Sequence, residues 1–352
     1  MPPEPPIVVD AAMLAQLSRA DLALGRLDGV IQEIPNPDLF VAMYVRREAV
    51  LSSQIEGTQS TLEDLLAVEL EPDARGLPND VDEVLNYVRA MSFGLERVAG
   101  LPLSKRLLRE IHGELLRSGR GARLAPGDFR RIQNWIGPDG ASQESATFVP
   151  PPVPVMHEAL DDLETFLHNH ELPALVHAGI AHAQFETIHP FMDGNGRVGR
   201  LLITFLLVHR QALQRPLLYL SLYLKRNRTE YYDRLTAIRR AGDWEGWMRF
   251  FLAGVEETAI EATTTARAIR EMRELHRAKV RDLTGANGGR LLDLLFMRPI
   301  VNVNLIAETL GIAFATANGL VSQFESNGLL QETTGGRRNR VFRYSPYLEL
   351  FA

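Results

Sequence analysis

Residues 189–200 are the segment that most constrains what this chain can fold into. They read His-Pro-Phe-Met-Asp-Gly-Asn-Gly-Arg-Val-Gly-Arg, and an apolar run from Leu201 to Val208 follows them directly. The apolar run predicts a buried helix, so the glycines lie where that helix begins. The first N–H groups of a helix have no partner within the helix, and the helix dipole attracts negative charge there. The segment therefore predicts an anion-binding helix start.

The polar side chains of this segment are suited to a nucleotide phosphate. Arg197 and Arg200 lie three positions apart on one helical face, where both guanidinium groups can bind phosphate oxygens. Asp193 offers hard carboxylate oxygens, which Mg²⁺ takes together with substrate phosphates. His189 precedes a proline outside the helix, and an imidazole can accept a proton near neutral pH. These residues predict a phosphate site with a metal and a general base.

Other glycine-rich sites do not fit the same residues. An EF-hand loop beginning at Asp193 would carry Arg197 at its fifth position and Thr204, rather than Glu, at its twelfth. A Walker P-loop needs Gly-Lys-Ser/Thr, which the segment lacks. A structural helix cap would explain Gly and Asn but not His, Asp and two Arg together. The histidines from His157 to His189 lack the spacing of two zinc ligands on one helical face.

Composition narrows the class of protein. The chain of 352 residues is long enough for two domains, carries a net charge of −6 and has no cysteine. The acidic balance argues against a protein that coats nucleic acid, and the lack of cysteine excludes disulfides and thiol chemistry. No apolar run reaches the length of a transmembrane helix, and the first residues lack the regions of a signal peptide. We therefore expect a cytoplasmic protein without membrane contacts.

Residues 189–200 match in full the Fic motif, His-Pro-Phe-x-Asp/Glu-Gly-Asn-Gly-Arg-x-x-Arg, and the chain resembles the Fic family. Fic proteins are mostly adenylyltransferases, which move AMP from ATP to a protein Ser, Thr or Tyr hydroxyl. The resemblance implies that His189 deprotonates the hydroxyl and that Asp193 holds Mg²⁺. It also implies that Asn195 and the glycine amides form an anion hole and that Arg197 and Arg200 bind the phosphates. The nucleotide-binding residues that it implies are Gly194, Asn195, Gly196, Arg197, Gly199 and Arg200.

A second motif lies upstream, at the end of a helix predicted over residues 38–57. It reads Ser-Ser-Gln-Ile-Glu-Gly from Ser52 to Gly57, and Gly57 suits a helix end. Taken alone, Ser52 and Glu56 would be a solvated helix end, because they are four residues apart on one face. Ser-x-x-x-Glu-Gly resembles the inhibitory motif of Fic proteins. The resemblance implies that Glu56 pairs with Arg200, so that ATP binds unproductively.

Two more segments acquire roles from the resemblance. Residues 131–150 break the helical period and predict a β-hairpin, which corresponds to the flap that clamps a target segment by strand addition. The candidate target-binding residues are Ile132, Trp135, Phe148 and Val149.

Tyr231 and Tyr232 precede a predicted helix, where such a pair is usually core packing. In Fic proteins a Tyr-Tyr pair at this distance lines the adenine and ribose pocket.

The C-terminal residues have a different pattern. A predicted helix, a helix-turn-helix and a basic hairpin resemble a winged helix, in which Arg337, Arg338 and Arg340 would contact DNA phosphates. Residues 290–352 hold six arginines and no lysine against five acidic residues, which is a weak basic footprint. A role in protein recognition or dimerisation is at least as well supported.

Together the patterns and the resemblance to the Fic family predict a mainly α fold with a Fic helical core, a β-hairpin flap and a small winged-helix domain. The expected divisions are an N-terminal helical region over 1–100, a catalytic core with a connector helix over 101–284, and the winged helix over 285–352. The expected function is ATP- and Mg²⁺-dependent transfer of AMP to proteins, the chain itself included, restrained by Glu56. The alternatives are a DNA-binding regulator with a secondary Fic activity, or a Fic enzyme that uses another nucleotide or removes AMP. A homodimer is compatible with the resemblance.

Overall fold

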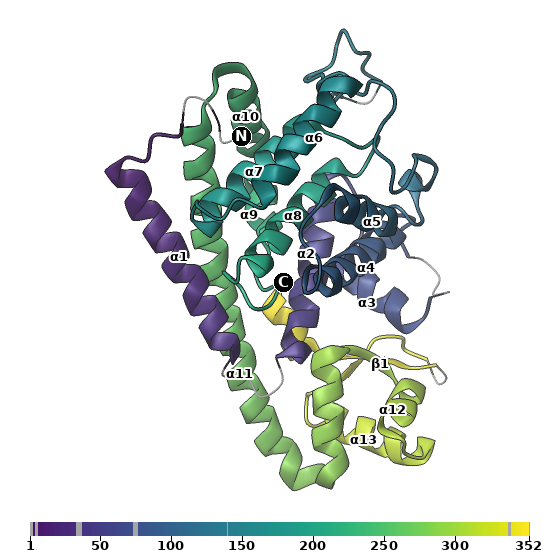
Figure 1. Cartoon of the computed structure of the whole chain (residues 1–352). Helices are drawn as coiled ribbons and strands as arrows, with labels where there is room; N and C mark the ends of the chain where they lie inside the picture. The colour runs from purple at the N-terminus through teal and green to yellow at the C-terminus, as the bar shows by residue number, and fades with distance from the viewer. Residues whose placement is uncertain are drawn as a thin grey trace.

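The computed structural model describes residues 3, 6–32, 37–72, 77–138, 140–336 and 339–351. Helices dominate this part of the chain, which confirms the predicted mainly α fold (Figure 1). The elements up to the connector are α1 (Ala11–Gln32), α2 (Asp38–Ile55), α3 (Leu62–Leu70), α4 (Val81–Val98), α5 (Lys105–Leu115), η1 (Arg120–Arg123), α6 (Val153–Leu167), α7 (Ala174–Ile188), α8 (Asn195–His209), α9 (Ser221–Arg226) and α10 (Arg228–Ala241). The remaining elements are α11 (Trp244–Met297), β1 (Ile300–Asn302), α12 (Val303–Leu310), α13 (Phe314–Ser326), β2 (Gln331–Glu332), β3 (Val341–Arg343), α14 (Ser345–Leu348) and η2 (Glu349–Phe351).

Helix α8 is the centre of the molecule and contains the predicted apolar run. Its residues from Val198 to Leu207 are buried, and α7 packs along it. Helices α2, α4 and α5 also contact α8. A helix that is apolar on all sides must be covered on all sides, and these four neighbours cover α8. This packing places the start of α8 beside the end of α2 and the first turn of α4.

The predicted hairpin over residues 131–150 forms only one antiparallel bridge in the described part of the segment. Ile136 and Phe148 exchange both backbone hydrogen bonds, at 2.8 and 3.0 Å. No named strand flanks this bridge among the described residues of the segment. The flap is therefore an irregular loop, in which the described residues pair as strands only at Ile136 and Phe148.

The glycine-rich residues 285–289, Gly-Ala-Asn-Gly-Gly, are typical of a linker, but they lie within helix α11. Helix α11 continues through them, interrupted only at Gly285, whose φ of 60° and ψ of −153° are not helical. Figure 1 shows α11 running beside α1 and turning back at its lower end. Since glycine tolerates this backbone conformation without strain, one residue is enough to reverse the helix direction.

The C-terminal elements form a small unit that is packed against the rest of the chain. The three strands are antiparallel in the order β1-β3-β2, with Val301 opposite Phe342; α12 contacts β1, and α13 packs against α12. This arrangement is compatible with the predicted winged helix. The ring of Phe351 lies 5.7 Å from that of Tyr44 on α2, edge to face. The C-terminal unit therefore contacts the helix that carries the Ser52–Gly57 motif.

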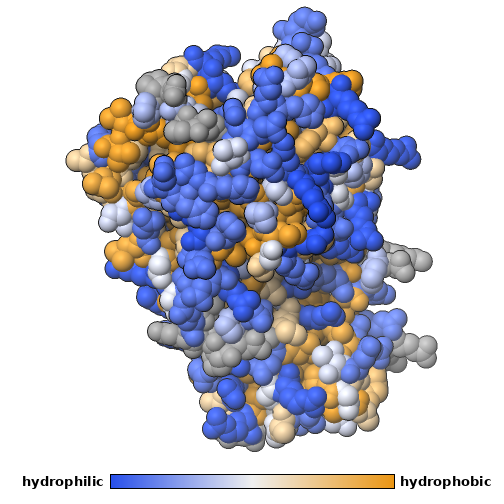
Figure 2. All heavy atoms as spheres, viewed as in Figure 1, coloured by the Kyte–Doolittle hydropathy of each residue, from blue (hydrophilic) through white to orange (hydrophobic). Residues whose placement is uncertain are grey.

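The visible surface is mostly hydrophilic. Figure 2 shows apolar side chains at the upper left, over the start of α1, where Val8, Val9 and Leu14 are exposed. In the part of the chain that the structure describes, no single helix combines the length and apolar composition of a membrane span.

Candidate active site

The start of α8 has the geometry of an anion site. Gly194 precedes the helix with a φ of 76°, and the first N–H groups of the helix have no intrahelical partner. The side chain of Asn195 holds the preceding loop, since Oδ1 accepts from Phe191 N and Nδ2 donates to Phe191 O, both at 2.8 Å. We predicted that Asn195 contributes to the anion hole. The loop uses Oδ1 and one hydrogen of Nδ2, so the second Nδ2 hydrogen and the backbone N–H are the donors left for that role.

Arg200 is bonded to the end of α2. Its Nε donates to Ser52 Oγ at 2.7 Å, and its Nη2 donates to Ser52 O at 3.0 Å and to Glu56 Oε1 at 2.6 Å. Glu56 is the C-cap of α2, and Gly57 follows it. Burial opposes ionisation of the Glu56 carboxyl, but the charge of Arg200 outweighs it and lowers the pKa of Glu56. The structure therefore brings together the predicted motif residues Ser52, Glu56 and Arg200.

The Glu56 carboxylate also covers the start of α8. A Cβ atom placed on Gly196 would lie 2.2 Å from Glu56 Oε1, so only glycine allows this approach. The helix dipole and the free N–H groups favour an anion at this point. Glu56 thus rests where the sequence predicts a phosphate.

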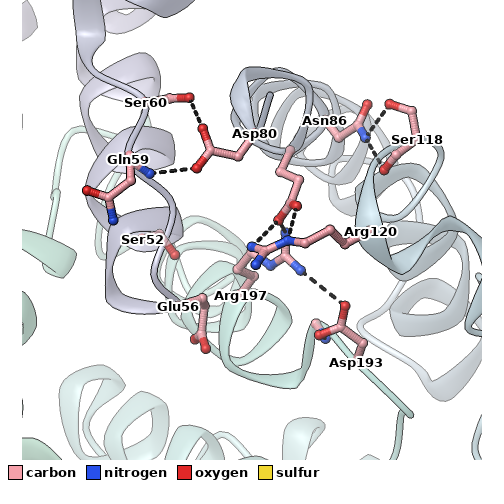
Figure 3. A network of polar contacts seen from close by, with 12 residues as sticks. Ser52, Glu56, Gln59, Ser60, Asp80, Asn86, Ser118, Arg120, Asp193 and Arg197 are labelled. Atoms are coloured by element: carbon pink, nitrogen blue, oxygen red, sulfur yellow. Dashed lines mark hydrogen bonds and ion pairs between the residues drawn. The ribbon is translucent and has the colours of Figure 1, made fainter. Parts of the chain in front are cut away.

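Arg197 has a partner that the sequence analysis did not identify. Its Nη1 donates to Glu83 Oε2 at 3.1 Å, while Arg120 binds the same carboxylate through Nε at 2.7 Å and Nη2 at 3.2 Å. Figure 3 shows Arg197 between Arg120 and Asp193, with Ser52 and Glu56 on the neighbouring helix. Glu83 is the third residue of α4 and looks like an ordinary acidic residue of a first helical turn. Its local pattern gives no signal of this contact.

Asp193 lies at the edge of the same cluster. Its Oδ1 accepts from Gly194 N at 2.7 Å, and its Oδ2 lies 3.7 Å from Arg197 Nη2. One partly exposed carboxylate beside a phosphate site suits Mg²⁺, which usually takes one or two carboxylates, substrate phosphates and water. Among the described residues no group of three or more His, Asp or Glu side chains is arranged to hold a metal by itself. The residues present therefore fit a metal that arrives with a nucleotide.

His189 follows the end of α7 in a left-handed conformation, with φ of 48° and ψ of 61°. Burial lowers the pKa of His189 to about 4, and the charges of Arg239 and Arg130 act in the same direction, while Glu56 opposes them. The imidazole is neutral at pH 7, which is the form that accepts a proton. The strained backbone and the neutral ring are both consistent with a functional residue.

Arg130 connects His189 to the flap. This arginine is 1% exposed and donates from Nε to His189 O at 3.1 Å. Its other nitrogens donate to Ile132 O and Pro151 O, one at each end of the flap segment. The sequence analysis did not select Arg130, because its partners are backbone carbonyls that no local pattern reveals.

The predicted flap residues face different surroundings. Ile132, Trp135 and Val149 are exposed, as a segment that binds a target would require. Phe148 is half-buried, and its ring centroid lies 3.9 Å from Arg239 Cζ. Phe148 is thus a fixed point of the flap, and the other three side chains are accessible.

Tyr231 and Tyr232 divide into a buried and an exposed residue. Tyr231 is buried behind α8, and its hydroxyl lies 2.9 Å from His182 Nε2. Tyr232 is exposed, and desolvation of its hydroxyl and the charge of Glu56 raise its pKa to about 12. Gly199 faces α7, because a Cβ there would lie 2.6 Å from a Glu186 oxygen. Tyr232 is therefore the accessible member of the pair, whereas Tyr231 is buried against His182 of α7, the helix that Gly199 also faces.

The predicted DNA contacts are described only in part. Arg337 and Arg338 lie outside the described residues. Arg340 donates from Nη2 to Asn318 Oδ1 at 2.8 Å and so joins the strand region to α13. The one predicted contact that the structure places is engaged within the C-terminal unit.

Comparison with known proteins identifies relatives of this arrangement. The family model described as Fic/DOC family N-terminal matches residues 14–96, and the model described as Fic/DOC family matches residues 102–207. The protein adenylyltransferase Fic of Drosophila willistoni is 28% identical over 211 residues, which are 58% of this chain and 39% of that protein. The protein of the same name from Drosophila virilis is 29% identical over 205 residues, 57% of this chain and 38% of that protein. The chain thus spans well under half the length of these curated relatives.

Solved structures share the fold. A Fic family protein from Desulfovibrio desulfuricans G20 superposes with a TM-score of 0.66 at 22% identity, covering 97% of this chain and 98% of that one. Fic-1 from C. elegans superposes with a TM-score of 0.52 at 18% identity, covering 75% of this chain and 74% of that one.

Proposed function

This chain belongs to the Fic/DOC family, and we propose that it is a protein adenylyltransferase that moves AMP from ATP to protein hydroxyl groups and is restrained by Glu56. The curated relatives that carry the name adenylyltransferase support this activity. The observation that carries the proposal is that Arg200, Arg197 and His189 all act on the Glu56 carboxylate, which lies against Gly196 in the first turn of α8.

The proposed reaction follows from these positions. The ATP phosphates bind the free N–H groups of α8 and the motif arginines, which stabilise their charge. His189 accepts the proton of the target hydroxyl, and that oxygen forms a bond to the α-phosphorus as the bond to the bridging oxygen breaks. Pyrophosphate leaves with the electron pair of that bond. When bound at Asp193, Mg²⁺ would offset phosphate charge.

The proposed restraint is competition between two anions. The Glu56 carboxylate binds Arg200 at 2.6 Å and lies against Gly196, where a phosphate would lie. A nucleotide that reaches the site must either displace this carboxylate or leave Arg200 unbound. The Glu56 side chain keeps 33% of its surface exposed, at the end of a helix, so it can leave without unpacking the core.

The test is transfer of label from ATP that carries a labelled α-phosphate, with purified chain and with host lysate as acceptor. Glu56→Gly should transfer more label than the unmodified chain. Adding His189→Ala should reduce transfer about 10²- to 10⁴-fold, the usual loss for a missing general base. Transfer that persists undiminished without His189 would overturn the proposed base. Transfer of a γ-phosphate label instead would show phosphorylation and overturn the proposed reaction.

A further inference from the structure

Two arginines of the Fic motif are bonded to two carboxylates from the N-terminal helices, and Glu83 has no role in the function proposed so far. Glu83 lies in the first turn of α4, with its side chain 5% exposed, and the Arg197 side chain is 4% exposed. Separating a buried ion pair of this kind inside the protein would leave two charges without compensation, at a large cost in free energy. The Glu83–Arg197 contact is therefore a fixed part of the fold.

The orientation of Arg197 follows from this contact. Glu83 Oε2 accepts a hydrogen bond from Arg197 Nη1 at 3.1 Å, whereas Arg197 Nη2 lies 3.7 Å from the Asp193 carboxylate. The charge of Arg197 also lowers the pKa of Glu56, which covers the anion site. One edge of the planar guanidinium is thus held from behind, and the other edge faces the place where phosphates bind.

Arg120 completes the arrangement from the outer side. Arg120 lies at the start of the short helix η1 and donates to Glu83 from Nε and from Nη2, while its own side chain remains 67% exposed. Two arginines share the Glu83 carboxylate, so Glu83 alone does not cancel their combined charge. A carboxylate that inhibited nucleotide binding would neutralise the arginine that binds the phosphates, as Glu56 neutralises Arg200. Glu83 cannot do so fully while Arg120 shares it.

We propose that Glu83 is a positioning residue, which holds Arg197 so that its free N–H groups meet the nucleotide phosphates. Glu83 then acts through Arg197 and does not touch the nucleotide. This inference rests on the proposed nucleotide site, and it assigns opposite effects to the two carboxylates. Removal of Glu56 should strengthen phosphate binding, and removal of Glu83 should weaken it.

The experiment measures affinity rather than chemistry. Displacement of a fluorescent ATP analogue gives the Kd of ATP and of adenosine for the full chain carrying Glu56→Gly, with and without Glu83→Gln. We expect Glu83→Gln to weaken ATP binding about tenfold, the lower range for hydrogen bonds to charged groups, and to leave adenosine binding unchanged. A structural role alone would weaken both ligands equally, and that result would overturn the proposal. Unchanged or tighter ATP binding would overturn it as well.

A double-mutant cycle and a control separate positioning from general damage. In the Glu56→Gly background, adding Glu83→Gln to Arg197→Gln should weaken ATP binding no further, because Glu83 acts only through Arg197. Additive losses would contradict that route. Glu69→Gln is the control, since Glu69 binds Arg46 on α2 with two hydrogen bonds at 3.0 and 2.9 Å and should leave ATP affinity unchanged. Glu83→Asp, which keeps the charge but retracts it, replaces Glu83→Gln if that variant does not fold.

The same titration separates this inference from the proposed function. If Glu56→Gly binds ATP but transfers no AMP, the proposed function fails, whereas the ATP and adenosine affinities still decide whether Glu83 positions Arg197.

Discussion

The two carboxylate–arginine pairs at the start of α8 use the same chemistry in different surroundings. Glu56 binds Arg200 from the end of a helix and remains 33% exposed, whereas Glu83 binds Arg197 from within a packed helix and is 5% exposed. The exposed pair can exchange its carboxylate for another anion. The buried pair cannot, because loss of Glu83 would leave the buried Arg197 with only Asp193, at 3.7 Å, as a charged partner. Similar distances therefore support opposite roles, and burial is what separates them.

The largest expected effect is on stability and concerns the buried pair. Glu83→Ala should lower the free energy of unfolding by about 3–5 kcal/mol, because it leaves Arg197 buried without its partner. Glu56→Ala should lower it less, because Arg200 keeps its hydrogen bonds to Ser52 Oγ and Ser52 O when the partly exposed carboxylate is removed. Urea denaturation of the two variants measures the difference. Equal losses would show that burial does not distinguish the pairs.

The next effect is on activity and concerns the exposed pair. Glu56→Gly should raise AMP transfer about 10- to 100-fold, since Arg200 then becomes free to make charge-assisted hydrogen bonds with phosphate. Initial rates with α-labelled ATP measure the change, and Glu69→Gln serves as the matched control. A Glu56→Gly rate equal to that of the unmodified chain would mean that Glu56 does not restrain transfer.

The sequence analysis predicted the exposed pair but not the buried one, and the reason is physical. Glu56 and Arg200 belong to motifs that can be recognised, and the predicted contact is present in the structure. Glu83 and Arg130 act through long-range contacts that only the packing of distant helices creates. The mainly α fold followed from apolar periodicity, but the course of α11 at Gly285 depended on one backbone conformation.

The Tyr-Tyr pair shows the same limit. Local sequence cannot tell which of two adjacent residues faces the core, and the structure buries Tyr231 against His182 while it leaves Tyr232 exposed. Asn195 is a second case, because its side chain is used by the loop before α8.

A smaller effect should come from the C-terminal unit. Phe351→Ala removes an aromatic contact with Tyr44 and so loosens the packing of α2, which carries Glu56. Aromatic pairs of this type contribute about 0.5–1.5 kcal/mol, so we expect transfer to rise by a factor of about 2 to 10. Phe351→Leu, which retains most of the apolar volume, should give a smaller increase. Identical rates for the unmodified chain and Phe351→Ala would mean that the exposed pair is independent of this packing.

The smallest effect concerns pH. Burial lowers the pKa of His189 to about 4. The ring is therefore neutral above pH 6, and it becomes protonated, and unable to act as a base, only as the pH falls toward 4. The single-turnover rate of Glu56→Gly should therefore be nearly constant from pH 6 to pH 8 and should fall at lower pH. A midpoint near the ordinary histidine pKa of about 6.5 would contradict the assigned environment of His189.

Transfer of an α-phosphate label, measured side by side in three chains, compares the two carboxylates most directly. These chains are the unmodified protein, Glu56→Gly, and Glu56→Gly combined with Glu83→Gln, assayed at an ATP concentration below the Kd of the second. The account predicts low transfer in the first, high transfer in the second, and a loss of about tenfold from the second to the third. Equal transfer in the second and third chains, or no gain from Glu56→Gly, would contradict it.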